Sequence, residues 1–274
     1  MDKYDSLFKK KIPKGNTLDM WEKYDFVNSS FIEIPSVIKM DGKSKIIVDL
    51  QYPKIGMKNA IDRCLVRKEV LERLLIACTY LPDNLSFKIW DAYRPWKLQN
   101  ELYYVYKPEI IKKFKLVKLS DSQQEKIISN YVSIPSKNSK FPPLHTTGGS
   151  IDLTITDLKE GNDLDFAVKF DEFSDLASTD YFENNSLNVG VKYNRRLLYN
   201  VMAKAGFTNL PSEVWHYDYG NRAWGYYVKK PAIYEGVFDI SKELSIISFA
   251  DFIDDLKKDN LKISLNKHKW EYYD

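Results

Sequence analysis

Apolar residues recur along the chain with two different periods, and each period predicts one kind of element. Over residues 63–81 they return every three or four positions, the spacing of a helix that buries one face. Over residues 85–89 and 151–155 they alternate with polar residues, as in a strand with one buried face. The same pattern predicts a short strand over 48–53, helices over 96–106, 194–205 and 248–257, and a strand over 213–219. Because strands and helices do not alternate regularly, we expect an α+β fold and not a doubly wound parallel sheet.

Composition narrows the class of protein further. Hydrophobic residues make up 44% of the chain and charged residues 29%, as in soluble globular proteins. The net charge of +3 is too small to indicate a nucleic-acid-binding protein. No apolar run approaches the roughly 18 residues that cross a bilayer, and residues 1–11 lack the apolar core of a secretory signal. We therefore expect a cytoplasmic protein without membrane or nucleic-acid partners, with Cys64 and Cys78 as buried thiols.

Two of the three histidines stand close to carboxylates in the sequence. Asp152 follows His145 after a Gly-Gly pair, and Glu213 precedes His216 by three positions. Two imidazoles and one carboxylate are a frequent ligand set for catalytic zinc, and a further carboxylate can take a proton from water. The residues therefore predict a zinc site with His145, Asp152 and His216 as ligands and Glu213 as the base. The alternative is that both histidines are ordinary surface or core residues, because such short spacings also occur by chance.

The local context of these residues adds a difficulty and a further candidate. Residues three apart share one face of a helix but not of an ideal strand, so we expect a twisted or bulged strand around Glu213 and His216. Arg94 stands at a predicted strand end, between Tyr93 and Pro95, where a guanidinium can project rigidly into a cleft. Such a cation can stabilise the oxyanion of amide hydrolysis. The alternative role for Arg94 is a structural salt bridge. The third histidine, His268, is expected to be solvated in a basic tail.

Three sequence blocks, in this order, resemble the bacterial D-alanyl-D-alanine dipeptidases, a group that includes the vancomycin-resistance dipeptidase. They are IWDAYRP over residues 89–95, HTTGGSIDLT over residues 145–154 and EVWH over residues 213–216. Three ordered motifs are far more specific than one. The resemblance extends over about residues 35–235, and it divides the chain into an N-terminal extension (1–34), a zinc dipeptidase domain (35–235) and a C-terminal extension of unknown role (236–274).

The resemblance implies a fold and a set of residue roles. The fold would be α+β with a central antiparallel sheet flanked by helices, as in other zinc peptidases of peptidoglycan and in hedgehog domains. One zinc ion per active site would be bound by His145, Asp152 and His216. Glu213 would be the catalytic base, and Arg94 would stabilise the transition state. Asp171 would bind the substrate's amino group, and Tyr93 is expected to contact the substrate as well.

The function implied by the resemblance is hydrolysis of D-Ala-D-Ala or a close D,D-dipeptide, with Glu213 assisting attack by zinc-bound water, in cell-wall peptidoglycan metabolism. One alternative is a peptidoglycan carboxypeptidase or endopeptidase on the same scaffold. Another is a non-catalytic zinc-binding recognition module, although such a module needs neither Glu213 nor Arg94. The family usually has serine where this chain has Pro143 and often tryptophan where it has Val214, so the dipeptide is less defined than the chemistry. The sequence predicts no oligomeric state.

Overall fold

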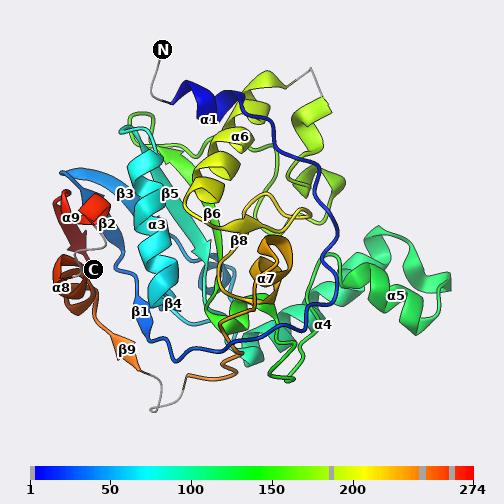
Figure 1. Cartoon of the computed structure of the whole chain (residues 1–274). Coiled ribbons are helices and arrows are strands. Elements are labelled where there is room, and N and C mark those ends of the chain that lie inside the picture. Colours follow the sequence, from blue (N-terminus) through cyan, green and yellow to red (C-terminus); the bar gives the residue numbers. More distant parts are fainter. Residues whose placement is uncertain (1–3, 185–187, 241–244, 259–262) are drawn as a thin grey trace.

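A seven-stranded mixed sheet forms the centre of the structure (Figure 1). The computed structural model describes residues 4–184, 188–240, 245–258 and 263–274. The strands lie in the order β10 (Trp270–Tyr273), β2 (Val37–Met40), β3 (Lys43–Val48), β5 (Leu85–Asp91), β6 (Ser150–Asp157), β8 (His216–Asp218) and β7 (Thr208–Asn209). Strands β3 and β5 are parallel, and the other neighbours in this sheet are antiparallel. The predicted α+β fold with an antiparallel-rich central sheet is therefore confirmed.

A smaller sheet and several helices complete the fold. The small sheet has the order β4 (Leu65–Arg67), β1 (Phe31–Glu33) and β9 (Ile246–Ile247). The helices are α1 (Asp5–Lys9), α2 (Gln51–Lys54), α3 (Lys68–Tyr80), α4 (Trp96–Lys113), α5 (Asp121–Ile128), α6 (Val189–Lys204), α7 (Arg222–Val228), α8 (Phe249–Lys258) and α9 (Ile263–Asn266). Short 3-10 turns occur at η1 (Leu116–Lys118), η2 (Leu144–Thr147), η3 (Asp175–Ala177) and η4 (Tyr181–Asn184). Among the described helices, none is long and apolar enough to cross a membrane.

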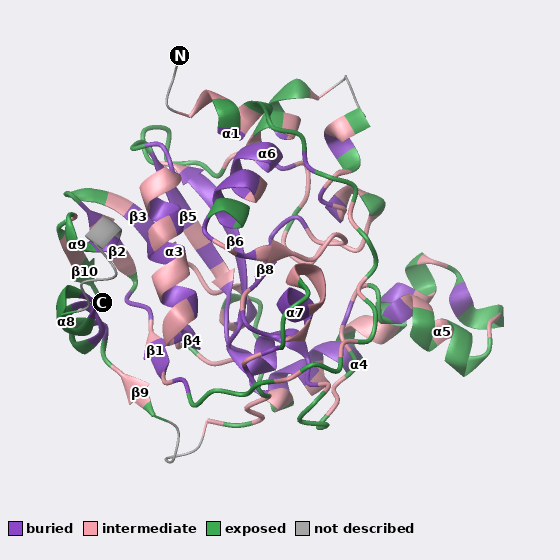
Figure 2. Ribbon diagram, viewed as in Figure 1, coloured by how far each residue is buried: buried purple, intermediate pink, exposed green. Residues whose placement is uncertain are grey.

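The main core lies between the sheet and helices α3 and α6, which cover the same face (Figure 1). Strand β6 explains how this core positions polar groups. Its apolar residues Ile151, Leu153 and Ile155 are fully buried in the main core, each contributing about 1.5–3 kcal/mol. Because successive side chains of a strand point to opposite faces, Asp152 faces away from this core. The central strands are buried on both faces, whereas α5 is largely exposed (Figure 2).

A second apolar cluster is built around helices α2 and α4. Its buried members include Tyr52 from α2 and Leu98 and Leu102 from α4. Three aromatic residues that are only partly buried, Tyr106, Phe170 and Phe173, pack against this cluster. These residues come from segments far apart in the sequence, so the cluster joins α2, α4 and the loop after β6.

Several predicted elements have other boundaries than expected. The strand predicted over 48–53 was wrong apart from its first residue: β3 ends at Val48, and residues 51–54 form α2. Pro53 lies in the first turn of α2, where its missing N–H is tolerated. The helix predicted from residue 63 begins at Lys68, because Leu65–Arg67 pair with β1 as strand β4. The helix predicted over 194–205 already begins at Val189.

The C-terminal segment contributes to both sheets. Strand β9 lies parallel to β1, and β10 lies antiparallel to β2. The helix predicted over 248–257 is confirmed as α8. The prediction for His268 was wrong: its Nδ1 lies 2.7 Å from an Asp41 carboxylate oxygen, and its side chain is 19% exposed. Cys64 and Cys78 are free and buried, as predicted.

Candidate active site

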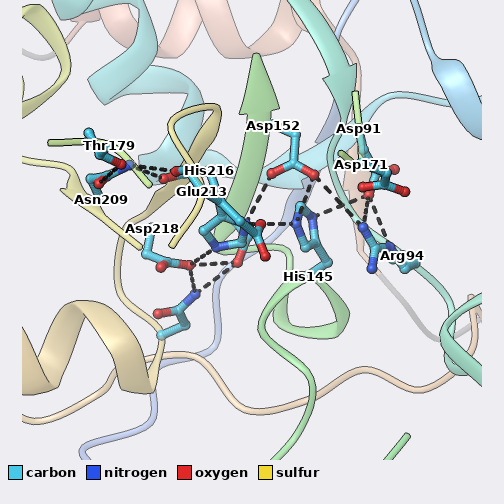
Figure 3. A network of polar contacts seen from close by, with 12 residues as sticks. Asp91, Arg94, His145, Asp152, Asp171, Thr179, Asn209, Glu213, His216 and Asp218 are labelled. Atoms are coloured by element: carbon cyan, nitrogen blue, oxygen red, sulfur yellow. Dashed lines mark hydrogen bonds and ion pairs between the residues drawn. The ribbon is translucent and has the colours of Figure 1, made fainter. Parts of the chain in front are cut away.

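Strands β6 and β8 bring two of the predicted ligands together. Their antiparallel register pairs Asp152 with His216. His145 reaches the same place from η2, the turn that leads into β6. That turn ends at Gly148 with φ +73°, and a Cβ there would lie 2.4 Å from the ring of Phe31, so the position requires glycine. One ligand atom from each of His145, Asp152 and His216 lies within 4.8 Å of the others, and Figure 3 shows the three side chains pointing toward one another.

The hydrogen bonds of the two imidazoles determine which ring nitrogens face inward as acceptors. His145 Nδ1 lies 2.6 Å from the carbonyl oxygen of Ala92, so it carries the hydrogen and leaves a lone pair on Nε2. His216 Nε2 lies 3.0 Å from the carboxylate of Asp218, which leaves a lone pair on Nδ1. These two free nitrogens are 3.1 Å apart. Both face the carboxylate of Asp152, at 3.3 Å and 3.0 Å.

Three electron-pair donors that converge in a buried space can hold a cation between them. Nitrogen and oxygen donors of this kind are the ligands that zinc takes in catalytic sites. The residues present therefore fit a divalent metal ion. The carboxylates around His216 also favour a positive charge at this place. Burial lowers the pKa of His216, but Asp218 and Asp152 outweigh this effect and hold the pKa well above its usual range.

Polar residues outside the ligand set hold His216 in place. Asp218 lies two residues further along β8, so both side chains are on the same face of the strand. Its Oδ1 accepts hydrogen bonds from His216, from Ser150 Oγ at 2.7 Å and from Asn221 Nδ2 at 2.6 Å. Such contacts outside the ligand set fix the tautomer and orientation of a metal-binding histidine.

Glu213 lies in a turn that precedes β8. Its backbone N–H donates to Leu210 at 2.9 Å, and its carbonyl accepts from the N–H of His216 at 3.2 Å. The strand predicted over 213–219 was therefore wrong at its start, and the turn, not a bulge, places Glu213 beside His216. The Glu213 carboxylate lies 3.8 Å from His216 Nδ1. Burial raises the pKa of Glu213 to about 8, with support from Asp152 and against the opposing effect of His216.

Arg94 forms the salt bridge that was the alternative to a catalytic role, and it also lies at the cavity. It forms an ion pair with Asp91 at 2.8 Å, and it also lines the cavity beside Asp152, whose carboxylate is 3.8 Å away. Further contacts fix the guanidinium: it donates to Gln99 Oε1 at 2.8 Å and to the hydroxyl of Tyr52 at 3.0 Å. Burial lowers the pKa of Arg94, but Tyr52, Asp91 and Asp152 raise it by a larger amount. The guanidinium therefore stays charged.

Asp171 lines the same cavity from the loop after β6. Its backbone is left-handed, with φ +54°, a conformation that Asp tolerates better than most residues. Its Oδ2 accepts hydrogen bonds from the hydroxyls of Tyr52 at 2.8 Å and Tyr106 at 2.9 Å. Burial and then the charge of Asp152 raise the pKa of Asp171 to about 6, although Arg94 and the two hydroxyls lower it.

The cavity between these groups is small, about 40 Å³. Its lining includes the predicted residues Arg94, His145, Asp152, Asp171, Glu213 and His216. Tyr93 is not among the described residues that line it. The ring of Tyr93 packs against Phe31, and its hydroxyl donates to the carbonyl of Val237 at 2.9 Å, so its position gives no support to a substrate contact.

Some residues of the site were not found from the sequence. Asp218 had a usable signal, because its spacing of two from His216 places it on the same strand face. Tyr52, Tyr106 and Gln99 had none, because they lie in remote segments and only the packing of α2 and α4 brings them to the cavity.

Comparisons with known proteins assign the chain to a group. The peptidase M15 family, described as D-ala-D-ala dipeptidase, matches residues 54–233. A D-alanyl-D-alanine dipeptidase of Synechocystis is 30% identical over 177 residues, which cover 59% of this chain and 71% of that protein. A D-alanyl-D-alanine dipeptidase of Escherichia coli is 29% identical over 157 residues, which cover 57% of this chain and 67% of that protein. The matched family region includes Arg94, His145, Asp152, Asp171, Glu213 and His216, whereas Tyr52 lies just before it.

Proposed function

Because the chain belongs to the D-Ala-D-Ala dipeptidase family of peptidases, we propose that it is a zinc-dependent dipeptidase that hydrolyses D-Ala-D-Ala or a close D,D-dipeptide. The convergence of three free donor atoms, from His145, Asp152 and His216, is the observation that carries the proposal. When bound there, zinc supplies Lewis-acid chemistry, which polarises a carbonyl and makes water more acidic.

The chain's own residues supply the remaining steps. Glu213, whose carboxylate lies 3.8 Å from His216 Nδ1, takes a proton from the attacking water and passes it to the leaving amine. Arg94 donates to the peptide oxygen as negative charge develops there. Its bonds to Asp91 and Gln99 hold the guanidinium in place before the substrate arrives.

Asp171 binds the substrate's ammonium group. Two tyrosine hydroxyls occupy one of its carboxylate oxygens, Oδ2, and leave the other oxygen for the ligand. A charged hydrogen bond of this kind selects a free amino terminus, because an internal peptide nitrogen cannot make it. The small cavity further favours a short substrate.

One set of measurements tests the proposal. Metal content and hydrolysis rates are determined on a panel of L,L-, L,D- and D,D-dipeptides, and a muropeptide is included for the carboxypeptidase or endopeptidase alternative. We expect bound zinc and a preference for D,D-dipeptides. A protein without zinc, or one that prefers L,L substrates, would contradict the proposal. Binding of zinc without any hydrolysis would favour the non-catalytic recognition module.

The role of Glu213 is tested separately. Glu213→Gln is expected to keep the metal and to lose about 10²- to 10⁴-fold in kcat, because the proton acceptor is removed. Glu160→Gln, in an exposed turn, is the matched control and should retain wild-type kinetics. A Glu213→Gln variant with near-wild-type kcat would show that another group is the base.

A further inference from the structure

Asp171 and Tyr106 stand between two separate spaces. On one side is the catalytic cavity of about 40 Å³. On the other is an open surface hollow of about 1030 Å³, whose lining includes Lys112, Lys113 and Lys169. Asp171 and Tyr106 line both spaces. The boundary at this end of the catalytic cavity is therefore formed by two side chains and not by a layer of core.

Contacts on each side fix Tyr106 in this boundary. Its hydroxyl donates to Asp171 at 2.9 Å, and its ring packs edge-to-face on Phe173 with centroids 4.9 Å apart. The residue lies in the middle of α4 and is partly exposed, because its outer side faces the hollow. A side chain with one face in the cavity and the other at the surface can close the cavity without being part of the core.

From this geometry we propose that Tyr106 determines substrate length by closing the cavity at the amino end of the substrate. The inference rests on the proposed function, in which Asp171 binds the substrate's ammonium. A residue attached to that nitrogen would have to occupy the place of the phenol ring. Without the ring, the extra residue would extend into the surface hollow. The hydroxyl has a second role, since it helps to hold the Asp171 carboxylate in its left-handed loop position.

Tyr52 also bonds to Asp171, but it is a different kind of residue. It is 2% exposed, and its hydroxyl accepts a hydrogen bond from Arg94. Substitution of Tyr52 would therefore disturb the catalytic arginine as well as Asp171. A substitution of Tyr106 can therefore change the substrate length that the cavity accepts, while Arg94 keeps its contacts with Tyr52, Asp91 and Gln99.

The test compares Tyr106→Ala and Tyr106→Phe with the wild type on two substrates. These are D-Ala-D-Ala and Gly-D-Ala-D-Ala, with initial release of Gly-D-Ala measured by chromatography, because this product identifies cleavage of the last bond. For Tyr106→Ala we expect the ratio of kcat/KM, tripeptide over dipeptide, to rise about 10- to 200-fold. Tyr106→Phe keeps the ring, so this ratio should stay at the wild-type value. Its KM should rise by the same factor, about tenfold, for both substrates with little change in kcat, because one bond that holds the Asp171 carboxylate is lost.

A matched control and a binding measurement keep the outcomes separate. Tyr104→Ala, on the same helix and 64% exposed, should change neither ratio nor KM. An unchanged ratio in a folded, metal-containing Tyr106→Ala variant would overturn the inference. If the wild type hydrolyses neither substrate, the proposed function fails, and calorimetric Kd values for the same two peptides replace the rates. The inference then survives only if Tyr106→Ala strengthens tripeptide binding relative to the dipeptide, and a wild type that binds neither peptide overturns both.

Discussion

The two ends of the catalytic cavity are built in different ways. At the end that holds the candidate metal ligands, called the ligand end below, Asp152 and His216 lie side by side on neighbouring strands. His145 enters from the turn just before β6. The opposite end is called the amino end, because Asp171 is proposed to bind the substrate's amino group there. Asp171 lies in a loop, and hydroxyls from α2 and α4 hold it. The first set is fixed by the sheet itself, whereas the second depends on three segments packing together.

This difference has an energetic consequence. A non-glycine residue with positive φ, such as Asp171, costs about 1–3 kcal/mol and persists only where its surroundings hold it. Burial of the carboxylate also raises its pKa to about 6. The amino end is therefore the strained and pH-sensitive end of the cavity. At the ligand end, the cost of gathering three donors is relieved when a cation binds.

The largest effect is expected from the ligand end. Asp152→Ala removes the one anionic ligand, so we expect loss of bound metal and at least about 10³-fold lower kcat/KM, because several kcal/mol of electrostatic stabilisation disappear. Metal content after dialysis and steady-state kinetics measure this. Asp157→Ala, at the end of the same strand, is the control and should retain both. An Asp152→Ala variant that keeps stoichiometric metal would contradict the ligand assignment.

The contrast between the two ends also explains what could be predicted from the sequence. His145, Asp152 and His216 lie in short motifs on adjacent elements, so spacing and resemblance were enough to predict that they meet. The alternation of Ile151, Leu153 and Ile155 correctly placed Asp152 on the opposite face of β6. Glu213 was assigned to a strand because β-forming residues follow it, and nothing in the pattern revealed the turn at 210–216.

At the amino end, the sequence carried less information. Asp171 was predicted through resemblance alone. Its partners Tyr52 and Tyr106 lie 119 and 65 residues away, and no local period connects them to it. The short helix that presents Tyr52 lies in a segment predicted as a strand, and Pro53 occupies the first turn of this helix. Tyr93 was expected to contact the substrate, but its hydroxyl bonds to Val237, whereas Arg94 bonds to Gln99 at the cavity.

The second prediction concerns the amino end. Asp171→Asn should raise KM for a D,D-dipeptide about 100-fold while changing kcat less, because the ammonium loses its charged partner. Metal content should be unchanged, which separates this variant from Asp152→Ala. Asp175→Asn, an exposed neighbour, serves as the control. A drop confined to kcat would place Asp171 in the chemistry and not in binding.

The same variant reports on stability. The pKa of Asp171 is raised in the folded protein, so the folded state holds its proton at a pH where the unfolded chain has lost it. The stability that this provides is present at acidic pH and is lost as the pH rises through about 6. Asp171→Asn should therefore have a Tm at pH 7 that equals or exceeds the wild-type value. A lower Tm would mean that the carboxylate stabilises its loop.

A smaller effect is expected from a substitution of Asp218, which bonds to the candidate metal ligand His216. Asp218→Asn keeps an oxygen that can accept from His216 but removes the charge, so zinc affinity should fall about tenfold. Competition with a chelator measures this affinity, and kcat at saturating zinc should change little. Asp171→Asn should leave the same affinity unchanged. If both variants weakened zinc equally, the two ends would not be independent.

The smallest effect tests the pH sensitivity of the amino end. When the pH falls below the Asp171 pKa of about 6, the carboxylate takes up a proton. It can then no longer pair with the ammonium, which stays charged. We expect kcat/KM at pH 5.5 to be about fourfold below its value at neutral pH, from one protonation of the free enzyme. Metal content is measured at each pH, because the carboxylates around His216 raise its pKa and a proton there competes with the metal. In Asp171→Asn this acidic decline should disappear although the overall rate is lower. If the decline persisted there, the titrating group would belong to the ligand end, and the pH sensitivity of the cavity would arise from the metal site.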